Sequence, residues 1–109
     1  MKVSRYFDAV PVPEIAGVTK REVITAKDGA PNFCMRVFEV EPGSSTPHHT
    51  HPWEHEVFVL SGQGKAVSRE GEKVLSQGSV VFVAPEEPHC FVNDGDQILR
   101  FICLIPIQK

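Results

Sequence analysis

The amino-acid sequence predicts an all-β sandwich or barrel formed by a single domain. Short extended runs recur about every 8–12 residues, and glycine, proline, asparagine and aspartate separate them. No window keeps a helical period for more than one or two turns. The length of 109 residues suits one domain, and a hydrophobic content of 41% is enough for a core.

Turn residues locate the individual strands. The first candidate, 21–25, ends at the breaker AKDGAPN, and the second, 33–41, ends at PGSS. A third candidate, 56–62, leads into a hairpin that is expected to pivot near Gly71. The two arms of that hairpin and the last three strands are expected at 64–70, 72–78, 79–84, 89–93 and 97–105.

Net charge and cysteine content indicate which binding partners and which cellular compartment to expect. The net charge is −3 and no basic run occurs, so we expect binding to neither nucleic acid nor an anionic membrane. No stretch approaches the roughly 20 apolar residues of a membrane span, and no signal-peptide core is found. Three cysteines without a CxxC pair argue against a disulfide framework and predict a cytoplasmic protein. Prolines interrupt residues 1–20, which we expect to form an arm on a barrel of residues 21–109.

Four of the five histidines fall within HHTHPWEH. In an extended segment His49 and His51 project to the same side, whereas His48 points away. Proline cannot donate to a β-ladder, so the chain should bend after this pair and return His55 to the same cavity. His89 opens a later strand that could cross this cavity. Neutral imidazole is a common ligand of divalent metals, so we expect a metal site, with a solvated histidine-rich loop as the alternative.

Glycines frame both groups of histidines. The segment GSSTPHHTHPWEHEVFVLSG runs from Gly43 to Gly62, and GSVVFVAPEEPHCFVN runs from Gly78 to Asn93. These segments resemble the first and second motifs of the cupin superfamily, in the same order and fifteen residues apart. The resemblance implies a double-stranded β-helix, also called a jelly-roll barrel. The HPWEHE form is similar to small single-domain cupins with a four-histidine metal site, some of which contain manganese.

The resemblance also implies a ligand set. One divalent metal per chain would be bound by His49, His51, His55 and His89. His55 stands where the family pattern has a glutamate, and Glu56 is the alternative ligand if the spacing is one residue longer. Manganese or iron is the expected ion in the cell, and the same nitrogen donors accept nickel, copper or zinc.

The second motif departs from the family pattern at its turn. Pro85 lies one residue later than the proline of the pattern, and Glu86 occupies a glycine position. Both departures affect the turn that precedes His89. The shape of that turn is therefore left open by the resemblance.

Strand alternation predicts the walls of the cavity. Within 33–41, outward Glu39 and Glu41 turn Arg36 inward, where it could hold a substrate carboxylate or pair with a protein acid. The predicted pocket consists of Arg36, Phe38, Phe91, Phe101, Cys103 and Ile105. Its apolar members could equally well only fill a small barrel. The opposite face of the strand is also apolar at Phe33, Met35 and Val37, and needs cover from the arm or from the second subunit of a homodimer.

These features predict a metal-dependent enzyme that acts on a small, partly hydrophobic or aromatic molecule. Oxygen-dependent cleavage, as in a dioxygenase, is the reaction we expect. The alternatives are a non-catalytic module that binds or senses a small ligand through the metal, and a structural site closed by four-coordinate zinc. The sequence shows no clearly positioned acid or base, so it leaves the catalytic residues unassigned.

Overall fold

Residues 1–108, which the computed structural model describes, fold into nine strands. The strands are β1 (Val12–Ile15), β2 (Val18–Ile24), β3 (Phe33–Val40), β4 (His55–Ser61), β5 (Gly64–Ser68), β6 (Gly71–Leu75), β7 (Val80–Val83), β8 (Cys90–Val92) and β9 (Leu99–Pro106). Two short 3-10 helices, Tyr6–Asp8 and Ala26–Asp28, are the helical elements of this part of the chain. Neither is long enough to cross a membrane. The predicted all-β class is confirmed.

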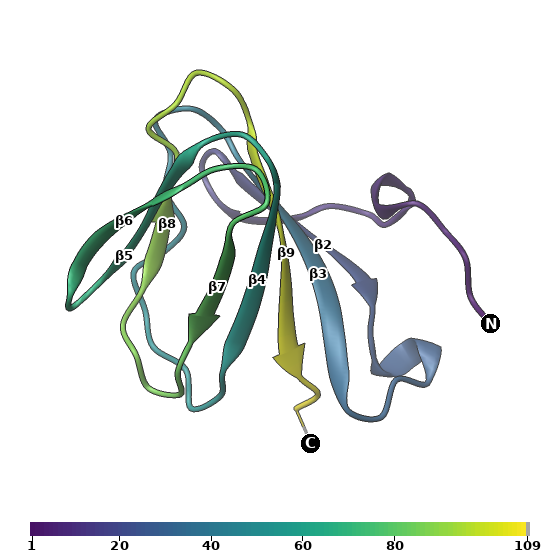
Figure 1. The fold of residues 1–109 in the computed structure, drawn as a ribbon. Coiled ribbons are helices and arrows are strands. Elements are labelled where there is room, and N and C mark those ends of the chain that lie inside the picture. Colours follow the sequence, from purple (N-terminus) through teal and green to yellow (C-terminus); the bar gives the residue numbers. More distant parts are fainter. Residues whose placement is uncertain (109) are drawn as a thin grey trace.

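The strands form two antiparallel sheets that face each other (Figure 1). In the described residues the larger sheet has the order β1-β2-β3-β9-β4-β7, and the smaller has the order β6-β5-β8. The last strand, β9, pairs with both β3 and β4, so the C-terminal strand lies in the middle of the larger sheet. This arrangement is the jelly-roll barrel that the sequence predicts.

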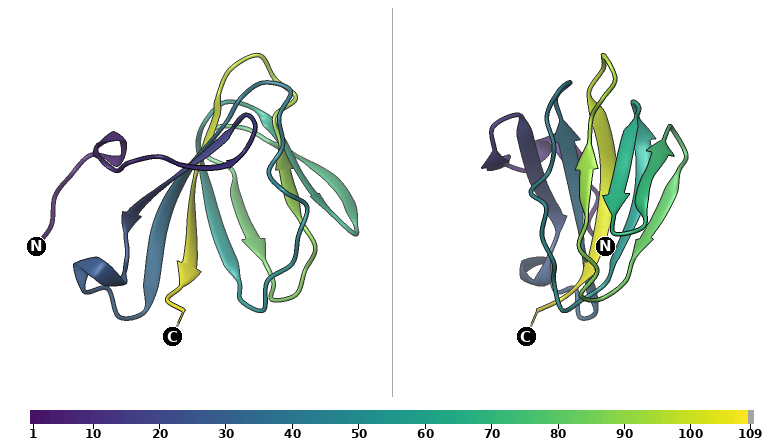
Figure 2. Two further views of the ribbon diagram at one scale, coloured as in Figure 1. Left: turned by 180° about the vertical axis from the view of Figure 1, so that it is seen from behind. Right: turned by 90° about the vertical axis from the view of Figure 1, so that its left-hand side faces the viewer.

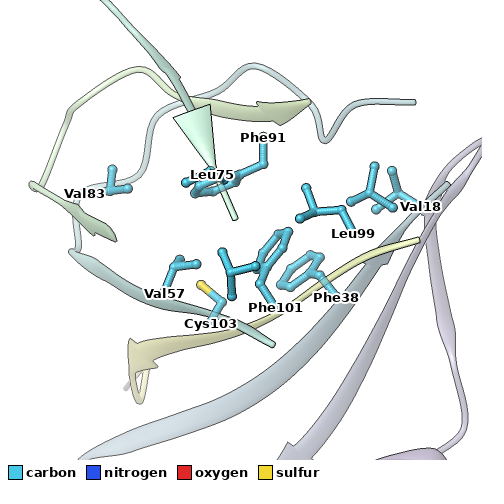
Figure 3. Packing of buried hydrophobic residues seen from close by; sticks show 11 residues of the cluster. Val18, Phe38, Val57, Leu75, Val83, Phe91, Leu99, Phe101 and Cys103 are labelled. Carbon is cyan, nitrogen blue, oxygen red and sulfur yellow. The ribbon is translucent and has the colours of Figure 1, made fainter. Parts of the chain in front are cut away.

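Side chains that alternate along the strands fill the space between the sheets. The inward residues of β9 are Leu99, Phe101 and Cys103, none of them more than 2% exposed. Figure 3 shows Phe91 and Leu75 of the smaller sheet opposite Phe38 and Phe101 of the larger one. The ring centroid of Phe101 lies 5.2 Å from that of Phe38 and 4.9 Å from that of Phe91. These three aromatic rings therefore join the two sheets across the core.

Two features of the larger sheet, the strand β1 and the surroundings of Glu39, differ from the sequence prediction. β1 lies within the segment expected to be an arm and pairs with β2 at the edge of the sheet (Figure 2). Glu39, which was expected to face solvent, is instead partly buried in an ion pair. Its Oε2 atom lies 2.6 Å from Nη2 of Arg100, because the two residues are direct partners across β3 and β9.

The turn between β7 and β8 contains a strained residue. Glu86 has a φ of 67°, and it is the one non-glycine residue with positive φ in the described chain. This is the position at which the second cupin motif has glycine, so the turn keeps the left-handed backbone without the residue that adopts it most easily. The Glu86 amide donates to the carbonyl of His51 at 2.7 Å, which ties the turn to the histidine-rich segment.

Glu86→Gly should therefore stabilise the protein. We expect the free energy of unfolding to rise by about 0.5–1 kcal/mol, because relief of left-handed strain exceeds the added entropy of glycine in the unfolded chain. Urea denaturation measures the change. The matched control is Glu87→Gly, which removes the side chain that accepts a hydrogen bond from the Ala84 amide and should destabilise the same turn. Equal losses of stability in both variants would show that the strain at Glu86 is not significant.

Candidate functional site

A cavity of about 240 Å³ lies between the two sheets. The loop that enters β4 and the loop from β7 to β8 lie at the same end of the sheets, at the bottom of Figure 1. These loops bring four histidines to the cavity lining, namely His49, His51, His55 and His89. The fifth histidine, His48, is exposed, as the alternation predicts.

The four imidazoles form a closed ring of neighbours. The centroid of His51 lies 4.4 Å from that of His49 and 5.2 Å from that of His55. The centroid of His89 lies 4.7 Å from that of His55 and 5.2 Å from that of His49. Each imidazole therefore has two others beside it, although the residues come from three separate segments of the chain.

Backbone hydrogen bonds hold the two motifs together. The amide of His49 donates to the carbonyl of His89 at 3.2 Å, and the amide of His89 donates to the carbonyl of His49 at 3.1 Å. The amide of Thr46 donates to the carbonyl of Phe91 at 2.9 Å, and Thr46 Oγ1 accepts from the Phe91 amide at 2.8 Å. The HxH segment therefore runs antiparallel to the start of β8, which fixes the relative positions of His49 and His89.

His55 and Glu56 lie on opposite faces of β4. His55 is 4% exposed and lines the cavity. Glu56 is exposed on the outer face of the sheet, where its neighbours in the flanking strands are Phe82 and Leu104. The sequence alone leaves both residues open as candidate ligands, and the structure brings only His55 to the other three imidazoles.

Burial favours the neutral form of these histidines. Desolvation is the main cause that lowers the pKa of His55 to about 3, and the nearby charges of His89 and Arg36 lower it further. Desolvation is also the main cause that lowers the pKa values of His49 and His51. Neutral imidazole is the form that binds a metal, so at neutral pH no proton has to be displaced from these rings.

The donor chemistry of the site fits a divalent transition metal. Nδ1 of His89 donates to the carbonyl of Glu87 at 3.0 Å, which leaves Nε2 as the free acceptor. Nδ1 of His51 and Nδ1 of His55 are buried without a hydrogen-bond partner. Within residues 1–108, no group of three or more His, Cys, Asp or Glu side chains is arranged as a metal-binding cluster. The bound ion is therefore a proposal that the chemistry of these nitrogens supports.

The predicted pocket residues mostly lie around the same cavity. Its lining includes Arg36, Phe38, Phe91, Phe101 and Cys103. Ile105 is not among the lining residues and packs against the hydrophobic core instead. The walls beside the histidines thus combine three phenylalanines with charged and polar side chains, which suits a small and partly apolar ligand.

Arg36 brings a positive charge into these walls. Its Nη2 atom donates to Cys103 Sγ at 2.9 Å, and its guanidinium carbon lies 5.0 Å from the centre of the Phe38 ring. Among the described residues it forms no ion pair with a carboxylate, and its Nε atom is buried without a partner. Burial raises the pKa of the Cys103 thiol despite this neighbouring charge, so Cys103 is a neutral thiol at neutral pH.

Three further side chains contact the site without having been predicted. The indole of Trp53 stacks on His51, with centroids 4.6 Å apart and planes at 16°. The sequence signal that could have identified Trp53 is its position in HPWEH, between the candidate ligands His51 and His55. Glu14 and Lys20 also line the cavity, and Lys20 Nζ lies 2.7 Å from Glu14 Oε1. No signal in the sequence identifies this pair, because its position depends on how β1 and β2 fold beside the barrel.

The fold and the site together define a small jelly-roll barrel with an internal cavity ringed by histidines. The chain belongs to the cupin family, because the Cupin_2 model, described as a cupin domain, matches residues 36–105. Membership of the superfamily, expected from the two motifs, is thereby confirmed. The finer resemblance to four-histidine manganese cupins stays a prediction.

The chain is also similar to proteins of known structure or function. The chain is 34% identical to the polyketide cyclase RemF from Streptomyces resistomycificus, with a TM-score of 0.89 over 99% of this chain and 80% of that chain. It is 21% identical to the cupin-2 domain Rru_A2000 from Rhodospirillum rubrum, with a TM-score of 0.85 over 99% of this chain and 76% of that chain. It is also 27% identical over 75 residues to the 1-methylthio-D-xylulose 5-phosphate methylsulfurylase of Rhodospirillum rubrum. That match covers 69% of this chain and 48% of the enzyme, so the chain spans about half the length of this curated relative.

Proposed function

We propose that this protein is a metal-dependent enzyme that acts on a small, oxygenated and partly apolar substrate. The observation that carries the proposal is the ring of four imidazoles in a cavity that three phenylalanines also line. His49, His51, His55 and His89 would hold one divalent ion, which is manganese or iron in the cell. When bound, the ion supplies a Lewis acid that polarises a substrate carbonyl.

Ring closure of a substrate with several carbonyl groups is the reaction that we favour. The support is the 34% identity to a polyketide cyclase over nearly the whole chain. Such a reaction starts with removal of a proton from a carbon next to a carbonyl. Oxygen-dependent cleavage, the reaction expected from the sequence, is the second candidate, because an ion held by four neutral imidazoles would have room for both substrate and dioxygen.

One set of measurements separates these candidates. Protein purified without chelators is analysed for metal, then incubated with linear 1,3,5-triketones, which can close to a six-membered ring, while oxygen uptake and products are followed. Cyclised product without oxygen consumption supports ring closure, whereas stoichiometric oxygen uptake supports cleavage. Metal-loaded protein that binds the compounds without converting them would favour the non-catalytic binding module.

Arg36 would bind an anionic group of the substrate. Its unpaired guanidinium in the cavity wall is the reason, since a partly buried charge gains most from a bidentate anionic partner. We expect Arg36→Ala to weaken the binding of a carboxylate probe such as benzoate by roughly 10- to 100-fold. Titration calorimetry measures this affinity, and metal content should stay unchanged. Arg100→Ala is the matched control, because Arg100 pairs with Glu39 instead. Equal affinities in both variants would exclude this role for Arg36.

We also propose that the protein is a cytoplasmic homodimer. Its three cysteines are free, which suits a reducing compartment. The outer face of the larger sheet exposes large apolar side chains, with Phe33 59%, Phe58 46% and Phe82 63% exposed. Val37 on the same face is only 3% exposed. A second copy would cover the part of this face that remains open.

Light scattering at micromolar concentration should therefore give the mass of two chains. Phe82→Glu should shift the protein to the monomer, because a charge would have to be buried in an apolar interface. Val74→Glu is the matched control, since Val74 is 83% exposed on β6 in the other sheet. A monomeric wild-type protein would exclude the dimer, and dissociation in both variants would place the interface elsewhere.

A further inference from the structure

Glu14 lies at an irregularity in the pairing of β1 with β2. Pro13 is opposite Thr19 and Ile15 is opposite Val18, so the register shifts across Glu14. Within β1, Glu14 is partly buried, whereas the other three residues are exposed. Bulges of this kind re-aim a side chain and are frequent beside active sites. Here the irregularity turns a carboxylate inward at the edge of the barrel.

The inward carboxylate reaches the histidine-lined cavity. Among the described residues, Glu14 is the only Asp or Glu in the cavity lining. Lys20 Nζ lies 2.7 Å from Glu14 Oε1 and lines the same cavity, so the carboxylate has a fixed position and a charged partner. The side chain of Glu14 is 26% exposed, which leaves it accessible to a ligand in the cavity.

The acidic residues nearest to the histidines in sequence lie elsewhere. Glu54 and Glu56 line a hollow on the outer side of the sheet, together with Phe33 and Pro106. Neither belongs to the cavity lining. The N-terminal hairpin therefore places a carboxylate in the cavity lining, where the histidine motif itself places none.

We propose that Glu14 is the general base of the reaction, an inference that depends on the proposed function. Its carboxylate takes the proton from the carbon next to a substrate carbonyl. The C–H bond breaks, its electron pair forms the enolate, and the proton remains on Glu14. Lys20 is a positioning residue that holds the carboxylate. General-base catalysis of this type contributes a factor of about 10²–10⁴ to the rate.

Deuterium exchange tests this step without knowledge of the natural substrate. The probe is ethyl 2-methylacetoacetate, whose acidic C–H lies between two carbonyl groups. Manganese-loaded protein in D₂O should accelerate exchange of this proton above the buffer rate, as measured by mass spectrometry of the extracted ester. We expect Glu14→Gln to reduce the acceleration by about 10²–10⁴-fold and Glu14→Asp to restore part of it. Glu56→Gln, the matched control, should exchange as fast as wild type.

A second readout follows the proton itself. Binding of acetylacetone should produce the infrared band of a protonated carboxylic acid, which ¹³C-labelling of the protein shifts and Glu14→Gln removes. Unchanged exchange in Glu14→Gln with unchanged metal content overturns the role of Glu14 and leaves the proposed function intact. Loss of metal in Glu14→Gln also overturns it, because the carboxylate would then serve the ion. Wild-type protein that binds no metal overturns the proposed function instead.

Discussion

His55→Ala should remove most of the bound metal, whereas Glu56→Ala should leave the metal in place. His55 is 4% exposed beside the other three imidazoles, and Glu56 points to the outer face of β4. Loss of one of four ligands should lower metal affinity by at least roughly 100-fold, more than the loss of a group that only orients a ligand. Metal analysis after dialysis against a weak chelator should find about one ion per chain in wild type and in Glu56→Ala, and nearly none in His55→Ala.

The choice of ion and of controls decides how this result is interpreted. Nitrogen donors bind nickel and copper more tightly than manganese or iron, so each variant should be loaded with the same ion before dialysis. His48→Ala is the matched histidine control, because His48 is exposed. Bound metal should raise the melting temperature of wild type and not that of His55→Ala. If Glu56→Ala loses the ion and His55→Ala keeps it, the site has three histidines and one glutamate.

Much of the fold could be predicted because the strands alternate clearly and turn residues separate them. Eight expected strands correspond to β2–β9, with ends that differ by a few residues. β1 was not predicted as a strand, since its sequence VPEI is short and contains a proline. Glu39 was misassigned to solvent because alternation says nothing about a partner such as Arg100 on another strand.

The site was predictable to the extent that its residues lie in two local motifs. The positions of His49 and His51 follow from strand periodicity, and His89 follows from the second motif. Alternation could not choose between His55 and Glu56, because both faces of β4 are apolar and only the tertiary fold shows which face lines the cavity. The place of Glu14 in the cavity could not be predicted, since a single sequence does not show a register irregularity at a sheet edge.

The stability of the metal-free protein should fall as the pH is lowered from about 6.5 to 3. The pKa of His55 is lowered to about 3 in the folded protein, mainly by burial, whereas a histidine in the unfolded chain titrates near ~6.5. Between these values the unfolded state binds the proton and the folded state does not. Acid therefore favours unfolding, with a slope of about 1.4 kcal/mol per pH unit for each such histidine. Chemical denaturation at a series of pH values measures this slope.

Two variants test whether His55 causes this pH dependence of stability. In the metal-free His55→Gln protein, the slope of unfolding free energy against pH should fall by about 1.4 kcal/mol per pH unit, because glutamine does not titrate. His48→Gln should keep the full dependence, since His48 is exposed. Bound metal should oppose acid unfolding, because it binds the neutral imidazoles of the folded state and competes with protons for them. An unchanged slope in His55→Gln would show that His55 becomes protonated in the folded protein near its ordinary pKa, and that its surroundings are wetter than the buried cavity described above.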